Sequence, residues 1–308
     1  MMAQQNGSRP MDATQAALKG LMPTDLSGKV MLVTGATDGI GKVTALELAR
    51  RGATVVGVGR NPEKCAAVEK EIRALAVNPA VEFIVADLSS QRDIHAVAET
   101  FKRNHRRLDV LVNNAGGIFY KRAESVDGIE MTWALNHMAY FLLTDLLLDV
   151  LKASAPSRIV SVSSGAHSFG KINFADLEHR NQVVGWRTYG QSKLANILFA
   201  KELAQRLEGT GVTSNALHPG FVASRFGRSG ESVMTTLVGW MQGMTAITPE
   251  QGAQTTLYLA TSPEVEGVTG LYFVKCKPVT PSAAAQDMEA ARRLWQVSEG
   301  MVGLAQRV

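Results

Sequence analysis

The sequence predicts an α/β fold built on a doubly wound parallel sheet of about seven strands, with helices on both faces. Three observations support this prediction. Short apolar runs alternate with longer segments of helical periodicity, a glycine-containing turn follows the first apolar run, and polar turn residues follow several later ones. Strands that alternate with helices form βαβ units, which have right-handed crossovers and a parallel sheet.

The expected elements follow one another in a regular order. The first strand, 30–34, is an apolar run typical of a strand buried on both faces, and it ends at a glycine turn. Later strands end in short polar turns, and the segments between them place apolar residues at helical spacing. We expect strands at 30–34, 54–59, 81–86, 108–112, 158–163, 212–217 and 271–274. We expect helices at 42–51, 62–76, 91–106, 133–152, 189–207, 249–261 and 287–302.

Length and composition fit one globular domain. The chain has 308 residues, of which 45% are hydrophobic, enough for one large core or two modest ones. We expect a polar arm over 1–27 and a single domain over 28–308. Residues 221–248 are too long for a plain connection, so we expect a substrate lid with an apolar wall; a surface helical hairpin is the alternative.

Charge and cysteine content exclude several classes of protein. A net charge of +4 is too small to indicate a nucleic-acid partner, and the two cysteines give neither a disulfide framework nor metal-ligand spacing. The N-terminus lacks a continuous apolar segment. The most apolar region, 138–151, contains Asp145 and Asp149 and is too short to cross a bilayer. We therefore expect a cytoplasmic protein with no integral membrane segment.

The glycine turn after the first strand has a physical use. Glycines allow the backbone to approach a ligand closely, and free N–H groups at the start of the next helix attract an anion. A Rossmann-type unit of this kind binds the pyrophosphate of a dinucleotide, although a tight turn without a ligand is the alternative. The spacing here is G-x3-G-x-G. The candidate residues are Gly35, Thr37, Asp38, Gly39, Ile40 and Gly41.

The end of the second strand predicts which dinucleotide binds. An acidic residue at this position binds the ribose 2′-hydroxyl of NAD, whereas an arginine accommodates the 2′-phosphate of NADP. The strand ends in Arg60 and Asn61, with no Asp or Glu. Lys42 is a second possible cation. The sequence therefore favours NADP(H) over NAD(H).

Other polar residues stand just beyond the ends of later strands. They are Asp87, Asn113, Gly116 and Ser164. Ligands of parallel sheets bind beyond the carboxyl ends of the strands, so we expect these residues to line one edge together.

Tyr189 and Lys193 form the most informative pair in the chain. Residues four apart share one face of a helix, so the phenol and the ammonium can approach one spot. A tyrosine has an ordinary pKa of about 10, and a neighbouring cation lowers it. We therefore expect Tyr189 to give and take protons near neutral pH.

Together these motifs resemble the short-chain dehydrogenase/reductase family over residues 28–275. The matching stretches, in the order typical of the family, are TGATDGIG (34–41), DL (87–88), NNAG (113–116), Asn136, Ser164, YGQSK (189–193) and HPG (218–220). Within the family the chain is most similar to the retinol dehydrogenase branch, in stretches that include TPEQGAQT and the tail RRLWQVSEGMVGL.

The resemblance implies a set of catalytic roles. Tyr189 would protonate the carbonyl oxygen during reduction, and Lys193 would lower its pKa and hold the nicotinamide ribose. Ser164 would donate a hydrogen bond to the carbonyl oxygen, with Ser163 as the rival for this role. Asn136 would anchor a water that relays protons to Lys193.

The resemblance also implies cofactor contacts. Gly35, Gly39 and Ile40 would approach the pyrophosphate, and Asp87 and Leu88 would meet the adenine. The remaining residues would contact the riboses and the nicotinamide amide; they are Asn113, Ala115, Gly116, Tyr189, Lys193, Pro219, Gly220 and Val222.

The resulting interpretation is an NADP(H)-dependent carbonyl reductase or alcohol dehydrogenase that acts on a small apolar carbonyl or alcohol. The alternatives are a double-bond reductase like protochlorophyllide reductase and a non-catalytic dinucleotide-sensing protein. His167 and His179 are interpreted as loop or helix-cap histidines. The helices at 133–152 and 189–207 are candidates for pairing in a homo-oligomer.

Overall fold

The computed structural model describes residues 24–180, 184–221 and 247–304. Its centre is an eight-stranded sheet in the order β3-β2-β1-β4-β5-β6-β7-β8. The predicted doubly wound parallel sheet is confirmed, because every pairing is parallel except β7 with β8. The strands are β1 (Val30–Thr34), β2 (Thr54–Gly59), β3 (Val81–Val85), β4 (Val110–Asn113), β5 (Ser157–Val162), β6 (Val212–His218), β7 (Tyr272–Val274) and β8 (Lys277–Pro278).

One strand more than the expected seven is present. The additional strand, β8, has only two residues and folds back antiparallel on β7. Lys275 and Cys276, both with positive φ, make the turn between them. A two-residue strand carries no alternation of apolar and polar side chains, so the sequence pattern gives no sign of it.

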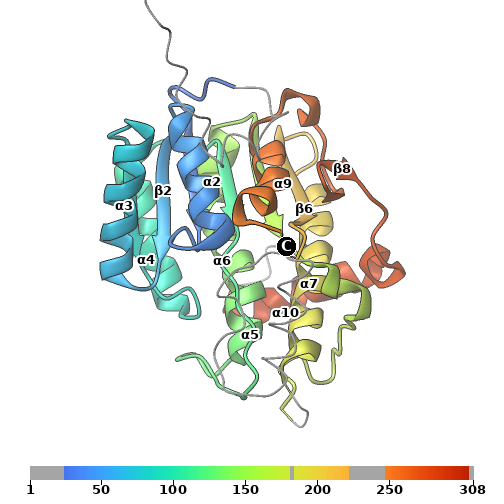
Figure 1. The fold of residues 1–308 in the computed structure, drawn as a ribbon. Helices are drawn as coiled ribbons and strands as arrows, with labels where there is room; N and C mark the ends of the chain where they lie inside the picture. The colour runs from blue at the N-terminus through green and yellow to red at the C-terminus, as the bar shows by residue number, and fades with distance from the viewer. Residues whose placement is uncertain (1–23, 181–183, 222–246, 305–308) are drawn as a thin grey trace, which may run out of the picture.

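Helices cover both faces of the sheet (Figure 1). On β1, Leu32 faces one apolar cluster, while Met31 and Val33 face the other, because successive side chains of a strand alternate. One face packs against α2, α3 and α9, and the other against α4, α6 and α7. The helices are α2 (Gly39–Arg50), α3 (Pro62–Ala76), α4 (Gln91–Asn104), α5 (Met131–Trp133), α6 (Ala139–Ala153), α7 (Trp186–Arg206), α9 (Pro249–Thr261) and α10 (Met288–Met301).

The order of the strands reverses between β1 and β4, which lie side by side at the centre. Hydrogen bonds connect the ends of these two strands. The backbone N–H groups of Asn114 and Ala115 donate to Thr34 Oγ1 over 2.8 and 3.0 Å, and Asn114 Nδ2 donates to the carbonyl of Thr34 over 2.8 Å. Such a switch point is where ligands of doubly wound sheets bind, so the fold positions a site beyond these two strands.

The apolar region around 138–151 belongs to a longer helical stretch than the sequence predicted. A π-helical turn, η1 (Ala134–Met138), connects α5 to α6, and the whole stretch Met131–Ala153 has 23 residues. By length and composition alone it could cross a membrane, so the expectation that this region is too short was wrong. Within the protein, 67% of its most apolar part is buried, which is typical of a core helix.

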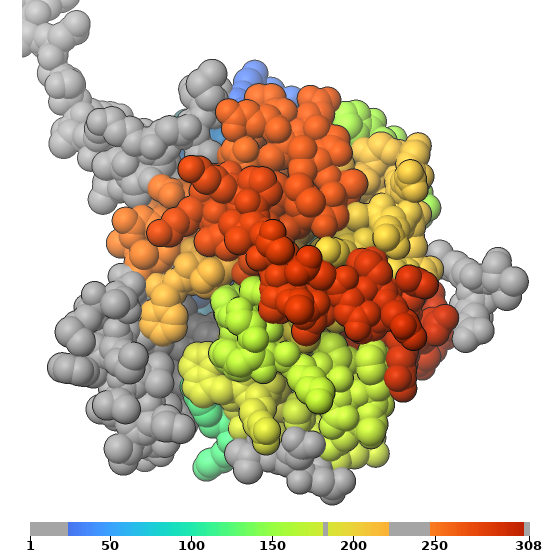
Figure 2. Space-filling view, turned by 90° about the vertical axis from the view of Figure 1, so that its right-hand side faces the viewer, coloured from blue at the N-terminus to red at the C-terminus, as the bar shows by residue number. Residues whose placement is uncertain are grey.

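The C-terminal helix α10 packs on α6 and α7 through Trp295. Its indole is stacked on Phe199 at 5.9 Å between ring centroids and meets Phe141 edge-on at 4.8 Å. The Arg206 guanidinium lies 4.3 Å from the indole centroid. The C-terminal segment, in red, therefore covers part of the two helices proposed for pairing, and it lies on the surface in Figure 2.

Two predicted segments fall partly outside the described residues. Residues 1–23 of the predicted arm do so, but Leu26 near its end is 5% exposed and belongs to the core. Most of the predicted lid, 222–246, lies outside as well. Its described ends meet, because the N–H of Ile247 donates to the carbonyl of Phe221 over 2.8 Å.

Candidate active site

The glycine turn overlaps the start of α2: Gly35 precedes the helix, and Gly39 and Gly41 lie in its first turn. The helix begins at Gly39, three residues before the predicted start, because the Asp38 carboxylate accepts from the N–H of Gly39 over 2.8 Å and caps the helix. Gly35 and Gly39 have φ of +65° and +51°, where a side chain is strained. A Cβ on Gly41 would overlap the carbonyl of Gly35. The turn therefore presents bare backbone at a helix N-terminus, the arrangement that binds phosphate.

A cavity of about 490 Å³ lies between this turn and α7. It is lined by twelve of the predicted cofactor residues and by Ser164. These residues are Gly35, Asp38, Gly39, Ile40, Gly41, Arg60, Ala115, Gly116, Tyr189, Lys193, Pro219 and Gly220. The described lining also includes Asn114, Val162, Ser163, Trp186, His218 and Phe221.

Two predicted cofactor residues, Asn61 and Thr37, contact the chain at the end of the second strand. The Asn61 side chain accepts from the N–H of Lys64 over 2.8 Å and caps α3. Thr37 packs against Gly59, where an added Cβ would lie 2.5 Å from the threonine methyl group. Neither residue is among the described lining of the cavity.

Asn113 points away from the cavity. Its amide is fully buried and donates to Thr144 Oγ1 on α6 over 2.9 Å. The next residue, Asn114, lines the cavity instead, since alternate side chains of an extended chain face opposite sides. Sequence reasoning did not single out Asn114, although the sheet period offered a signal for it.

Arg60 is the cation at the mouth of the cavity. Its side chain is 71% exposed, and its only ion pair within the described residues is a 3.9 Å contact with Asp87. Asp87 also accepts from the N–H and hydroxyl of Ser89, and Leu88 beside it is buried. Lys42, the other possible cation, is bound to Glu71 over 2.7 Å and is absent from the described lining. Val222 lies outside the described residues.

Ser164 and Tyr189 meet in the cavity, and Ser163 does not join them. The Ser164 hydroxyl is hydrogen-bonded to the Tyr189 hydroxyl. The Ser163 hydroxyl donates to the carbonyl of Lys193 over 2.6 Å and is buried. Of the two serines that the sequence left open, the structure brings Ser164 to the tyrosine.

Lys193 reaches the same place from one turn further along α7. Its ammonium lies 5.7 Å from the centroid of the Tyr189 ring and donates to the carbonyl of Val162 over 3.0 Å. A Cβ on Gly116 would lie 3.4 Å from Nζ and 3.1 Å from Asn136 Oδ1, so a side chain there would contact both groups. Burial lowers the pKa of Lys193 to about 7.

The expected lowering of the tyrosine pKa is not observed. Burial raises the pKa of Tyr189 to about 12, and the hydrogen bond from Ser164 offsets this only in part. A buried phenolate loses its hydration, and the lysine, which is itself partly neutral at this depth, does not restore it. The phenol is therefore protonated across the neutral range.

Asn136 lies in the π-helical turn and holds the chain beside Lys193. Its Oδ1 accepts from the N–H of Gly117 over 2.8 Å, and its Nδ2 donates to the carbonyl of Gly117 and to Ser192 Oγ. The side chain is fully buried, and Gly116 packs against both Asn136 and Lys193. Asn136 is not among the described lining of the cavity, and its contacts connect Gly117 to Ser192, the neighbour of Lys193.

The wall beside Tyr189 is apolar. Ile118 and Ala166 form a small buried cluster with the tyrosine, and Tyr120 and Trp186 pack against it. The Trp186 ring meets Tyr189 edge-on at 5.7 Å between centroids. Sequence reasoning sought an apolar wall only in 221–248 and missed these aromatic residues, which stand in other segments.

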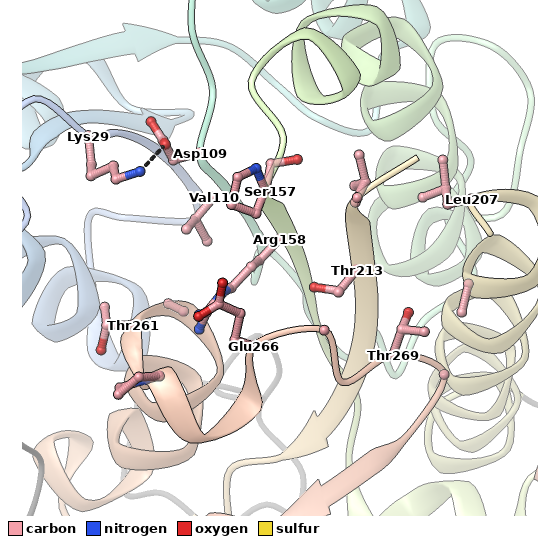
Figure 3. A pocket seen from close by; sticks show the side chains of 18 of the residues that line it. Lys29, Asp109, Val110, Ser157, Arg158, Leu207, Thr213, Thr261, Glu266 and Thr269 are labelled. Atoms are coloured by element: carbon pink, nitrogen blue, oxygen red, sulfur yellow. Dashed lines mark hydrogen bonds and ion pairs between the residues drawn. The ribbon is translucent and has the colours of Figure 1, made fainter. Parts of the chain in front are cut away.

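A second cavity, of about 870 Å³, lies at the opposite edge of the sheet (Figure 3). The Lys29–Asp109 ion pair, 3.0 Å long, lies on one side of it, and Arg158 lies beside Glu266. The Arg158 guanidinium donates to the carbonyls of Leu259 and Ser262, near the end of α9. No predicted site residue is among its described lining, and Lys29, Asp109 and Arg158 already have partners in the fold.

Comparisons with known proteins agree with this geometry. The short chain dehydrogenase family profile matches residues 29–232. Retinol dehydrogenase 13 from Homo sapiens is 45% identical over 284 residues, which cover 91% of this chain and 86% of that protein. Retinol dehydrogenase 14 from Homo sapiens is 44% identical, with coverage of 94% and 91%.

Solved structures show the same fold. An uncharacterized protein from Mycobacterium paratuberculosis superposes with a TM-score of 0.73 at 33% identity, covering 91% of this chain and 95% of that one. The Pseudomonas aeruginosa RhlG/NADP active-site complex superposes with a TM-score of 0.65 at 29% identity, covering 81% and 95%.

Proposed function

This chain belongs to the short-chain dehydrogenase family, and from that premise we propose that it is an NADP(H)-dependent oxidoreductase acting on an apolar aldehyde, ketone or alcohol. One observation carries the proposal. Tyr189, Ser164 and Lys193 converge on one wall of a cavity whose other end is the glycine turn at the start of α2. A hydride donor bound along this cavity and a carbonyl held at Tyr189 would share a single enclosed space.

The residues of the cavity fit a dinucleotide. The Gly35–Gly41 turn offers bare backbone to a pyrophosphate, and Gly116 leaves room beside Lys193 that a Cβ would fill. Lys193 uses one of its donors on Val162 and has others for ribose hydroxyls. Bound there, the nicotinamide would supply the hydride chemistry that no side chain provides.

Tyr189 is proposed as the general acid of carbonyl reduction. Because burial raises its pKa to about 12, the phenol holds its proton at neutral pH and can give it to the oxygen that becomes an alkoxide. Ser164 accepts from the N–H of Ala166 over 3.2 Å and is hydrogen-bonded to the Tyr189 hydroxyl. Its single proton would turn from the tyrosine to the carbonyl oxygen when a substrate binds beside both hydroxyls. The two hydroxyls thus polarise and protonate one oxygen.

The proposed substrate is apolar because of the wall around the tyrosine. Trp186 and Phe221 line the cavity with apolar surface, and Ile118 and Tyr120 pack with Tyr189. The human relatives are named as dehydrogenases of retinol, which is an alcohol of this chemical class. Retinal and medium-chain aliphatic aldehydes are therefore the first substrates to test, with NADPH oxidation as the readout.

Arg60 is proposed to bind the 2′-phosphate of NADP. Arg60→Glu is expected to raise the Kd for NADPH about tenfold to a hundredfold, because a charge-assisted hydrogen bond is replaced by repulsion. The Kd for NADH is expected to change less than about threefold, since NADH has no phosphate at this position. Titration of both dinucleotides by fluorescence measures the difference.

Lys42→Glu is the matched control, because it reverses the same charge on a residue that is bound to Glu71 and outside the described lining. It is expected to affect both dinucleotides equally and weakly. Equal losses of NADPH and NADH in Arg60→Glu, or a larger NADPH loss in Lys42→Glu, would contradict the role of Arg60.

A further inference from the structure

The peptide bond between Ser164 and Gly165 has a histidine on each side. Its carbonyl, from Ser164, lies 2.8 Å from Nδ1 of His167, in the 3-10 helix η2 (Gly165–Phe169). Its N–H, from Gly165, donates to Nδ1 of His218 at the end of β6, over 3.1 Å. Both polar groups of one peptide are therefore held by imidazoles from different elements.

The two imidazoles must be opposite tautomers. A carbonyl only accepts, so His167 carries its proton on Nδ1, and its Nε2 accepts from the N–H of Ser282 over 3.3 Å. His218 accepts at Nδ1, so its proton is on Nε2. Burial lowers the pKa of both rings, that of His218 to about 4, which keeps His218 a neutral acceptor at neutral pH.

This arrangement fixes Ser164. The backbone of Ser164 is held by the hydrogen bonds of the Ser164–Gly165 peptide to the two histidines. The Ser164 Oγ accepts from the N–H of Ala166. With one lone pair committed to Ala166, the hydroxyl is held within hydrogen-bonding distance of Tyr189. Loss of either imidazole would remove a hydrogen bond that keeps this peptide, and with it the backbone of the serine turn, in one orientation.

His218 also reaches the other side of the cavity. The same Nδ1 accepts from the N–H of Gly220 over 3.4 Å, and both Gly220 and Pro219 line the cavity. The His218 ring packs against Gly165, since a Cβ there would lie 3.3 Å from Nε2. One imidazole therefore connects the serine turn to the loop that follows β6.

We propose that His167 and His218 are positioning residues that orient Ser164, and that His218 also couples the serine turn to the Pro219–Gly220 loop at the dinucleotide. This proposal rests on the proposed function. His167 acts on the serine alone, whereas His218 acts on the serine and on the dinucleotide loop. The two histidines therefore differ in which kinetic and binding constants they control.

Asparagine and glutamine variants test the proposal at each position. An asparagine places its amide where Nδ1 of histidine stands, and a glutamine moves the amide one methylene further out. His218→Gln is expected to lower kcat for nonanal and retinal about tenfold or more and to raise the Kd for NADPH, because the N–H groups of Gly165 and Gly220 lose their acceptor. His218→Asn is expected to restore most of both.

His167→Gln is expected to lower kcat by a similar factor while the Kd for NADPH stays within about twofold. His167→Asn should again recover turnover. Thermal unfolding of all four variants tests whether they are folded. Asparagine and glutamine both remove the imidazole ring, so a comparison of the two at one site isolates the effect of the position of the amide.

The outcomes separate this proposal from the proposed function. If the wild-type protein oxidises no NADPH with retinal, nonanal or any other member of a panel of aliphatic, aromatic and isoprenoid carbonyls, the proposed function fails. If the wild type is active but asparagine and glutamine behave alike at both sites, the positioning role is overturned. A His218→Gln protein with unchanged NADPH affinity overturns the coupling between the two loops.

Discussion

Tyr189→Phe is expected to lower kcat for carbonyl reduction about a thousandfold, while the Kd for NADPH stays within about twofold. The substitution removes the hydroxyl that Ser164 contacts and that is proposed to protonate the carbonyl oxygen. General acid catalysis contributes about a hundredfold to ten-thousandfold to a rate. The phenylalanine ring keeps the edge-on contact with Trp186, so the apolar wall and the fold stay intact.

Steady-state kinetics and a fluorescence titration with NADPH measure the two constants separately. Tyr258→Phe is the matched control, since Tyr258 lies on α9 with its hydroxyl bonded to Glu264 over 3.0 Å, away from the cavity. It is expected to keep wild-type kcat. A Tyr189→Phe protein that retained more than about a tenth of wild-type kcat would remove the tyrosine from the mechanism.

Lys193→Met is expected to lower kcat at least about a hundredfold and, in the absence of dinucleotide, to stabilise the protein at neutral pH. Turnover falls because no ammonium remains to hold the ribose hydroxyls of the proposed dinucleotide. Stability rises because an ammonium that is 3% exposed is replaced by an apolar chain of similar length. The carbonyl of Val162 stays satisfied, since Asn196 Nδ2 also donates to it over 3.3 Å.

The stability difference has a defined pH dependence. The Lys193 pKa is about 7 when folded against 10.5 as its ordinary value, so the unfolded chain binds more protons between these two values. The wild-type protein therefore carries the full cost of burying the charge below about pH 7 and loses that cost as the pH rises toward 10.5. We expect Lys193→Met to gain on the order of 4 kcal/mol in unfolding free energy near pH 7.

Urea unfolding of both proteins, without dinucleotide, at several pH values between 7 and 10 measures this gain. It should shrink steadily as the pH rises. A gain that is constant across this range would show that Lys193 is not a buried titrating group. A destabilised but inactive variant would point to a structural role for the lysine.

The sequence predicted the sheet and the position of the site because these depend on local patterns. The apolar run of β1, the glycine turn and the polar ends of later strands each report on a few neighbouring residues. Topology then brings those ends together, so Gly35, Gly116 and Tyr189 line one cavity as expected. The strand boundaries differ by only one or two residues from those predicted.

Side-chain direction and electrostatics could not be predicted in the same way. Successive side chains of an extended chain face opposite sides, and the sequence does not show at which residue the chain turns. Asn114 therefore faces the cavity, although Asn113 was expected to do so. The tyrosine pKa depends on burial as well as on its lysine neighbour, and burial dominates. Tyr189 is buried by residues from a distant segment of the chain, such as Ile118 and Tyr120.

Contacts between remote elements were also hidden. The Ser164–Gly165 peptide is held by His218 from β6 and by His167, which the sequence indicated only as a loop or cap residue. Trp295 is stacked on Phe199 because α10 packs against α7. Helical periodicity predicts that α10 has an apolar face but does not predict which helix that face contacts.

Transfer of deuterium tests the central claim most directly. NADPH carrying deuterium at both carbon-4 positions is incubated with the wild-type protein and retinal or nonanal, and the product is examined by mass spectrometry. We expect one deuterium on the carbinol carbon of the alcohol for each NADPH oxidised. NADPH oxidation with no deuterium in the alcohol, or no oxidation with any member of a panel of aliphatic, aromatic and isoprenoid carbonyls, would contradict it.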